Sequence, residues 1–327
     1  MASQIRFRLA AAIAMLGAAL ALGATTGARA AEKLAVARSS ASGFTFDPLN
    51  IGIEKGIYAK HGLDVQMSVM EGSAKLHQAM LAGALDIGLG AGTDISFLVK
   101  GSPETAVGAI MIGAGIYGLV LGPDSQIHAV ADLKGKKIGV STIGSLTQWL
   151  VLRLVQQQGW TRDDITMVTV GSNATGQTAA LETHQIDAVM GAAALGWQLE
   201  TQHRGRLLIP ASQIVSNFLM NAAFASNRLV AEQPEAIRAF LAAWYETVAY
   251  MRANRDETVT LARAIDGFAQ EVEERNYDAV MPSMSADGKF PPEGLAALRR
   301  SFVDLEILPS EPDVAKYVTE RFLPGAR

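Results

Sequence analysis

Short runs rich in valine and isoleucine alternate with segments of helical periodicity along most of the chain. This alternation is typical of an α/β fold with parallel strands. The predicted strands are Lys33–Arg38, Asp64–Met70, Ile87–Gly90, Lys137–Ser141, Thr166–Val170 and Ala188–Gly191.

The predicted elements form a pattern that occurs twice. Lys33–Val36 corresponds to Lys137–Val140, and Ala84–Gly90 corresponds to Gln185–Gly191, about a hundred residues later. Between these marks both halves follow the order strand, loop, helix, strand. The helices concerned are Lys75–Ala82 and Gln177–Thr183. The repeat predicts two lobes, each with a sheet built on one βαβαβ unit and flanked by helices.

The two lobes are predicted to be interleaved along the chain. The repeated units are contiguous, and the C-terminal helices must still pack against one of them, so we expect the chain to return to the first lobe. We assign residues 31–120 and 222–327 to lobe one and residues 121–221 to lobe two. The two hinge crossings are expected near residues 118–123 and 218–225.

Two further helices are predicted from periodicity. Thr147–Gln158 has one apolar face, and Gly159 is suited to end it. Pro234 suits the first turn of a second helix. We expect that helix to bury its apolar stripe in the core, rather than to form a ligand site, through Ile237, Phe240, Leu241, Trp244, Val248 and Met251.

The N-terminus has the layout of a cleaved secretory signal peptide over residues 1–30. Arg6 and Arg8 precede an uncharged apolar run of 14 residues, Leu9–Leu22, and Ala28-Arg29-Ala30 forms the cleavage motif. The run would span about 21 Å as a helix, short of the roughly 30 Å hydrocarbon core. An uncleaved membrane anchor is the alternative. Since the chain has no cysteine, it is not a lipoprotein, and we expect a periplasmic protein.

Composition narrows the function classes. The 327 residues are enough for about two domains, and the absence of cysteine excludes thiol nucleophiles, disulfide scaffolds and zinc fingers. Removing the signal peptide changes the net charge from −4 to −7, because it carries three arginines and no acidic residue. An acidic chain is a poor partner for polyanions, so we expect no nucleic acid binding.

Five loops are candidates for ligand binding, because ligands bind beyond the carboxyl ends of parallel strands and near helix N-termini. All five are rich in small or hydroxyl-bearing residues, which lets backbone N–H groups approach a ligand. They are Arg38–Phe44, Gly90–Asp94, Ser141–Thr147, Gly171–Asn173 and Gly191–Ala193.

The strongest candidate is Thr142–Ser145, which joins a predicted strand to a helix. Free N–H groups and the positive end of the helix dipole meet there, so we expect it to contact an anionic ligand. The alternative is that Ser145 or Thr142 only caps the helix. Several charge-assisted hydrogen bonds are needed for micromolar affinity, so loops from both lobes must contribute.

The remaining loop residues each have two interpretations. Arg38 is the only basic residue in the five loops, and either pairs with a ligand carboxylate or sulfonate or forms a salt bridge with a neighbour. Phe44 and Phe46 either line an apolar wall or pack in the core. For Asp94, capping of the following helix is preferred over contact with a ligand amine.

Other motifs give no support for catalysis, metal or cofactor binding. Gly88–Gly92 resembles a dinucleotide fingerprint, but its third glycine comes one residue early and it follows the third strand. No nucleophile–base pair is visible, and we predict that the protein is not an enzyme. The histidines lack ligand spacing and are expected at the surface or on helix faces: His61, His77, His128, His184 and His203.

Several segments resemble the nitrate/sulfonate/taurine family of substrate-binding proteins of ABC transporters. Three of them lie in the repeated half-units: Glu54–Val65, Ala82–Gly88 and Asp132–Val140. Ala225–Arg228, followed by Gln233–Phe240, resembles the return crossing of that family and its helix.

This resemblance implies the type II periplasmic-binding-protein fold, with the solute in a cleft between the lobes. It implies an ABC permease of the inner membrane as partner. One departure is Gly191–Ala194, which replaces bulkier residues and suggests a roomier wall in lobe two. The residues at matching cleft positions are Ser39, Ser40, Gly90, Thr93, Thr142, Gly144, Ser145 and Asn173.

We therefore expect a monomeric solute-binding protein, with no cofactor, that binds a small organic anion such as a sulfonate or carboxylate. Three alternatives remain. The first is a cleft for a pyrimidine or vitamin precursor stacked on Phe44. The second is an enzyme on the same fold, such as a pyrimidine-precursor synthase. The third is a solute sensor that docks on a membrane receptor.

Overall fold

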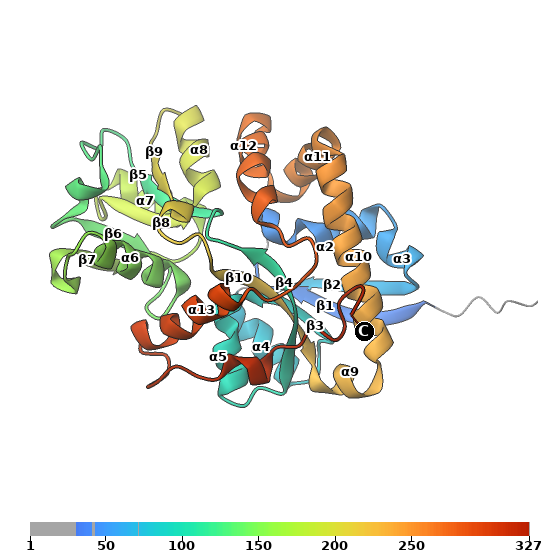
Figure 1. Ribbon diagram of the computed structural model, residues 1–327. Helices are drawn as coiled ribbons and strands as arrows, with labels where there is room; N and C mark the ends of the chain where they lie inside the picture. Colours follow the sequence, from blue (N-terminus) through green and yellow to red (C-terminus); the bar gives the residue numbers. More distant parts are fainter. Residues whose placement is uncertain (1–30, 41–42, 71, 327) are drawn as a thin grey trace, which may run out of the picture. The chain divides into compact units, whose positions relative to one another are not determined.

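The computed structural model describes residues 31–40, 43–70 and 72–326, and Figure 1 shows their elements. The predicted signal peptide and its cleavage motif lie outside the described residues. Two five-stranded sheets form the framework. In the first sheet the spatial order is β2-β1-β3-β10-β4. Its strands are β1 (Glu32–Arg38), β2 (Leu63–Val69), β3 (Ile87–Ala91), β4 (Glu104–Ile112) and β10 (Leu219–Ser226).

The second sheet has the same plan as the first. Its order is β7-β6-β8-β5-β9, so three parallel strands are again followed by two antiparallel pairings. Its strands are β5 (Tyr117–Leu121), β6 (Lys137–Val140), β7 (Thr166–Thr169), β8 (Ala188–Ala192) and β9 (Arg206–Pro210). The six predicted strands and the duplicated unit are confirmed.

Helices connect and flank the strands. Within the described residues, none combines the length and apolar character needed to cross a bilayer. The α-helices are α2 (Asp47–Glu54), α3 (Ile57–Lys60), α4 (Ser73–Leu81), α5 (Ile95–Val99), α6 (Leu146–Gln157), α7 (Ala174–Glu182), α8 (Ala193–Thr201), α9 (Asn227–Glu232), α10 (Pro234–Ala253), α11 (Arg255–Asp266), α12 (Gln270–Val280) and α13 (Pro292–Asp304).

In each sheet one strand is formed directly after the chain arrives from the other sheet. This strand is β10 in the first sheet and β5 in the second, and each is fourth in the spatial order. The chain leaves the first sheet after β4 and enters the second at β5, within residues 113–116. It returns between β9 and β10, within residues 211–218. The segments expected as crossings are instead strands, because their apolar residues are buried between sheet neighbours. Residues 117–120 therefore lie in the second sheet and residues 219–221 in the first.

The predicted apolar stripe of α10 is core. Its six residues are at most 1% exposed, and the ring of Phe240 lies 5.5 Å from that of Tyr58 on α3. Gly52 allows α2 to lie close to α3 and α10, since a Cβ there would come within 2.5 Å of Tyr58 on α3 and of Thr247 on α10. The C-terminal helices thus pack on the helices of the first sheet.

Candidate functional site

The parallel strands bring the predicted loops together at one edge of each sheet. In the first sheet, β1 and β3 pair through Arg38 and Leu89, and the N–H of Ser39 donates to Leu89 O at 3.0 Å. In the second sheet, the N–H of Gly171 donates to Ser141 O at 3.1 Å. Each sheet therefore presents its own set of adjacent loops at the carboxyl ends of its strands.

The strongest predicted loop is held by its own side chains. Ser145 is the N-cap of α6, and its Oγ accepts from the N–H of Gln148 at 3.3 Å. Its Oγ also lies 2.9 Å from Oγ1 of Thr147, which accepts from the N–H of Ser141 at 2.9 Å. Gly144 has φ of +81° and donates its N–H to Oε1 of Gln148 at 2.6 Å. Ser145 thus caps the helix, while Thr142 stays exposed.

The two other loops of the second sheet are also shaped by local contacts. Asn173 caps α7, with Oδ1 accepting from the N–H groups of Thr175 and Gly176 at 2.9 and 3.2 Å. Gly191 is buried at the end of β8, where a Cβ would lie 2.8 Å from Oε1 of Gln177. Gln177 in turn donates to Gly171 O at 2.8 Å. Asn173 is exposed. Because Gly191 has no side chain, the end of β8 can lie next to Gln177, which holds the loop after β7.

In the first sheet, Arg38 forms internal contacts beneath the loop after β1. Its side chain is 1% exposed. Nε donates to the carbonyl oxygen of Ser40 at 2.7 Å, and Nη1 donates to Oδ1 of Asn50 at 2.7 Å. Nη1 also lies 3.4 Å from Oδ1 of Asp47. Of the two interpretations of Arg38, the structure shows the salt bridge with a neighbour. Ser39 and Ser40 are half-buried.

Asp47, the salt-bridge partner of Arg38, lies with two further carboxyl groups, and sequence reasoning did not find this cluster. Asp47 begins α2, Asp266 ends α11 and Glu273 lies on α12. Burial raises the pKa of Asp47 well above its usual range, and the charges of Asp266 and Glu273 add to this, against the lowering effect of Arg38. Burial and then the charge of Asp266 raise the pKa of Glu273 to about 7.

These three carboxyl groups outnumber the two arginines whose charges act on them, Arg38 and Arg263. Burial also raises the pKa of Asp266, although the N–H of Gly43 donates to its Oδ1 at 2.8 Å. Within the part of the chain that the structure describes, one oxygen of each acid has no hydrogen-bond partner: Oδ2 of Asp47, Oδ2 of Asp266 and Oε2 of Glu273. The underside of this loop is therefore acidic, which disfavours an anion at Arg38.

The aromatic residues after β1 are packed rather than open. Phe44 and Phe46, in the 3-10 turn Phe44–Phe46, are 2% and 4% exposed. The ring of Phe44 meets Tyr277 of α12 edge-on, with the centroids 5.8 Å apart. Core packing is thus the interpretation of Phe44 and Phe46 that the structure shows.

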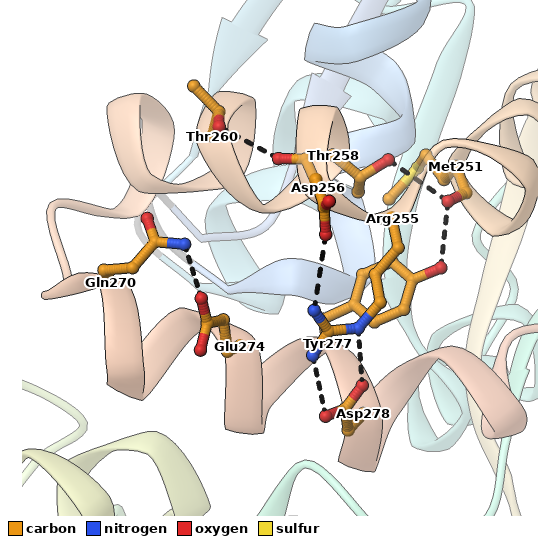
Figure 2. Close-up of polar contacts among 9 residues, drawn as sticks. All are labelled: Met251, Arg255, Asp256, Thr258, Thr260, Gln270, Glu274, Tyr277 and Asp278. Atoms are coloured by element: carbon orange, nitrogen blue, oxygen red, sulfur yellow. Dashed lines mark hydrogen bonds and ion pairs between the residues drawn. The ribbon is translucent and has the colours of Figure 1, made fainter.

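Polar contacts fasten α12 to α11, as Figure 2 shows. Arg255 donates from Nε and Nη2 to the two carboxylate oxygens of Asp278 at 3.0 and 2.8 Å, and its guanidinium lies 5.4 Å from the ring centroid of Tyr277. The hydroxyls of Tyr277 and Thr258 both donate to the carbonyl oxygen of Met251, at 2.9 and 3.2 Å. The ring that supports Phe44 is therefore held in place.

The other side of α12 covers the start of α8. Val272 packs with Ala193, Ala194 and Trp197. Arg275 lies over the Trp197 ring at 5.3 Å and pairs with Oε2 of Glu200 at 2.7 Å. Ala193 and Ala194 are 1% and 5% exposed, so the small residues after β8 make room for α12. Only Ala192 of this alanine run is exposed, and the suggested roomier wall is largely filled.

The loop after β3 is built from glycines and one buried acid. Asp94 stands at the N-cap of α5 but forms no side-chain capping bond to it, so the expected capping of the following helix is not seen. Its Oδ2 instead accepts from the N–H of Ala91 at 2.9 Å and closes the 3-10 turn Gly92–Asp94. A Cβ on Gly90 would lie 2.4 Å from that oxygen, and one on Gly92 would lie 1.9 Å from Leu219 O. The glycine run thus serves packing at the end of β3, and Thr93 beside it is half-buried.

His77 lies on a face of α4, which agrees with the expected helix-face position, but this face is buried. It is 3% exposed, and its ring lies between Asp94 and Glu104. Its partners come from segments 17 and 27 residues later in the chain, so no local spacing indicated them. Among the described residues, no group of three or more histidine and acidic side chains is arranged to hold a metal ion.

A cavity of about 440 Å³ lies away from these loops. It is found where β6 and β8 begin, next to Gly122, Lys136, His184 and Asp187. Since ligands of such sheets bind at the carboxyl ends of the strands, this cavity is not the predicted site.

Two sheets of identical strand plan, each ending in a set of small-residue loops and joined by two crossings, define a two-lobed periplasmic-binding-protein fold. Within this class, the sequence model of the NMT1/THI5-like family matches residues 44–258, and the chain belongs to that family. The fold and the family resemblance predicted from sequence are both confirmed.

Curated relatives are similar to part of the chain. A putative binding protein of Brucella abortus (strain 2308) is 29% identical over 217 residues, which cover 64% of this chain and 65% of that protein. The riboflavin-binding protein RibY of Chloroflexus aurantiacus is 23% identical over 236 residues, covering 71% of this chain and 66% of that protein. The chain thus spans about two thirds of the length of the relatives it matches.

Solved structures show the same fold over nearly the whole chain. The alkanesulfonate-binding protein SsuA of Xanthomonas axonopodis pv. citri, bound to MOPS, has a TM-score of 0.74 at 18% identity, covering 88% of this chain and 98% of that one. The desulfurization enzyme DszB has a TM-score of 0.67 at 18% identity, with 89% and 97% covered. The fold therefore occurs in a binding protein and in an enzyme.

Proposed function

We propose that this chain is the exported solute-binding component of an ABC importer. In this proposal it works in the periplasm as a monomer, without a cofactor and without catalysis, and delivers its solute to an inner-membrane permease. The observation that carries the proposal is the pair of loop sets at the carboxyl edges of two sheets, between which the chain crosses twice through short segments. Such crossings allow hinge motion, and a solute that contacts both loop sets stabilises the closed form.

The solute we propose is a small organic anion, a sulfonate or carboxylate. Its contacts would come from the half-buried or exposed loop residues Ser39, Ser40, Thr93 and Thr142, together with backbone N–H groups at the start of α6 and α7. Ser145 and Asn173 would shape these loops as caps. The two lobes would be the first sheet with the C-terminal helices, and the second sheet with α6, α7 and α8.

A second candidate is a pyrimidine or vitamin precursor. Two observations favour it: the acidic groups under the loop after β1, and the internal engagement of Arg38. Both make the first sheet a poor place for a full negative charge and a better one for N–H donors of a heteroaromatic ring. The name of the riboflavin-binding relative points to the same chemical class.

A thermal-shift screen followed by calorimetry on the chain beginning at Ala31 distinguishes these candidates. The panel is MOPS, taurine, nitrate, a short carboxylate, an aminopyrimidine and riboflavin. A solute at a hundred times its Kd adds about 2.7 kcal/mol of stability, which gives a clear rise in Tm. A rise with MOPS or taurine supports the anion, whereas a rise with the heteroaromatic compounds alone supports the second candidate. No rise with any compound contradicts both solute classes.

A separate measurement tests the importer role. An ABC permease and ATPase from the same organism, reconstituted in liposomes, should hydrolyse ATP faster when the solute-loaded protein is added. Stimulation of a membrane receptor instead would support the sensor alternative. Conversion of the solute into a product by the purified chain would support the enzyme alternative.

A further inference from the structure

His77 lies in the interior of the first sheet's lobe between two acids from different elements. It belongs to α4, Asp94 ends the turn after β3, and Glu104 begins β4. Nδ1 of His77 lies 2.8 Å from Oε2 of Glu104, and Nε2 lies 3.2 Å from Oδ2 of Asp94. The imidazole stacks on Phe97 of α5 at 4.6 Å and meets Phe224 of β10 edge-on at 5.2 Å. These contacts fix the ring.

This geometry favours the imidazolium form, although only Nδ1 is aligned for a hydrogen bond and Nε2 faces Asp94 as an ion pair. A neutral imidazole has one N–H, so it would leave one of the two carboxylates facing a lone pair. Burial lowers the pKa of His77, but the adjacent carboxylates of Asp94 and Glu104 outweigh burial and raise the pKa to about 9. The charged groups facing the ring are these two acids, while α5 and β10 contribute aromatic rings.

Asp94 connects His77 to the loop after β3. The Oδ2 atom that faces His77 also accepts the N–H of Ala91 at 2.9 Å. Gly90 has no side chain, and a Cβ there would displace this oxygen. The charge of Asp94 also raises the pKa of Tyr117, after the effect of burial, at the point where the chain enters the second sheet. The carboxylate of Asp94 therefore interacts with the histidine, with the loop after β3 and with the first residue of β5.

We propose that His77 is a positioning residue: as a cation, it orients Asp94 and thereby sets the geometry of the loop Ala91–Thr93 on the first-sheet side of the binding site. The loop's contact with solute rests on the function proposed above, but its positioning by His77 does not. The role of His77 is electrostatic and depends on its proton, so it can be separated from simple filling of the core.

The direct test is an NMR titration of the isotopically labelled chain from pH 6 to 10.5, without solute. We expect both ring nitrogens of His77 to carry protons at neutral pH. The amide shifts of Ala91 and Thr93 should change with the apparent pKa of His77, near 9. Amides of the second sheet, such as Gly144, should not follow that titration.

Two variants and a control sharpen this test. In His77→Gln, the titration of the Ala91 and Thr93 amides near pH 9 should disappear. In Asp94→Asn, an oxygen remains to accept from Ala91, but the amide shifts should no longer follow His77. His61→Gln removes a histidine that pairs with Glu246 elsewhere on the lobe, and should leave the loop titration unchanged. A neutral His77 at pH 7, or loop amides that ignore its titration, would overturn the proposal.

An affinity measurement connects the positioning to binding, with MOPS as the probe. His77→Gln should weaken MOPS binding about tenfold, and wild-type affinity should fall above pH 9, with no such fall in the variant. If wild type binds neither MOPS nor taurine, the proposed sulfonate class fails, while the solute-free titration still decides the role of His77. Unchanged MOPS affinity in a folded His77→Gln protein would contradict a contact between the positioned loop and the sulfonate, while the solute-free titration decides the positioning itself.

Discussion

The backbone N–H of Gly43 donates to Oδ1 of Asp266 at 2.8 Å, although 223 residues separate them. This bond attaches the loop after β1 to the end of α11. Asp266 also raises the pKa of both Asp47 and Glu273, so one carboxylate is at once a loop anchor and a source of electrostatic strain.

We expect Asp266→Asn to separate these two effects. Asparagine keeps an oxygen for Gly43 but removes the charge, so the pKa of Glu273 should fall from about 7 toward its ordinary value. A carbon-detected NMR titration of the Glu273 carboxyl measures this change. Asp278→Asn, on the side of α12 that faces Arg255, is the control and should leave the pKa of Glu273 where it is.

Glu273 predicts a pH dependence of stability. Its folded pKa, about 7, lies above the ordinary value of 4.5, so the folded state binds the proton more tightly than the unfolded state. Its contribution is therefore most favourable below about pH 4.5 and is lost as the pH rises through 7. The shift corresponds to roughly 3 kcal/mol at most.

Glu273→Gln should accordingly be more stable than wild type at pH 8 and lose that advantage at pH 4. Urea unfolding at several pH values gives the free energies of unfolding. Glu271→Gln, at an exposed position of the same helix, is the matched control. Stability curves that stay parallel for wild type and the Glu273 variant would contradict the buried ionisable role.

The alanines after β8 give a prediction about packing. Ala193 is 1% exposed against α12, so Ala193→Phe should cost about 1–3 kcal/mol of stability through overpacking. Ala192 is exposed, and Ala192→Phe should change stability by no more than about 0.5 kcal/mol. Thermal melts of the two variants measure the difference. Equal melting points for Ala193→Phe and Ala192→Phe would mean that α12 shifts to accommodate the larger side chain at position 193.

Sequence reasoning found the parallel strands because buried strands of this kind are continuous apolar runs bounded by glycine and polar residues. It missed β4, β5, β9 and β10 because an apolar run such as Leu219–Ala225 fits a crossing equally well. Leu219–Ala225 is a strand because it pairs with β3 and β4, which lie more than a hundred residues earlier in the chain.

Part of the candidate site could likewise be predicted from the sequence, and part could not. The loops follow from local strand–helix junctions, so Ser145 could be placed from sequence as a possible cap. Asn173 is expected from sequence only as a loop residue in the cleft, and its capping of α7 is not predicted. The acids next to Asp47, the partner of Arg38, could not be placed, since Asp266 and Glu273 arrive from α11 and α12 through tertiary packing. Burial of His77 likewise depends on acids from two other elements.

The last prediction concerns Ser145 and Thr142. Since Oγ of Ser145 accepts from the N–H of Gln148, Ser145→Ala should lower the free energy of unfolding by about 1 kcal/mol and leave solute affinity near normal. Thr142 is exposed at the same loop, so Thr142→Ala should do the reverse: stability stays near wild type, while affinity for an ionised solute falls about tenfold or more through the loss of one donor. Urea unfolding without solute, paired with calorimetric titration of whichever solute the screen identifies, measures both quantities. A loss of affinity in Ser145→Ala with unchanged stability would make Ser145 a ligand contact, and its capping bond would then be secondary.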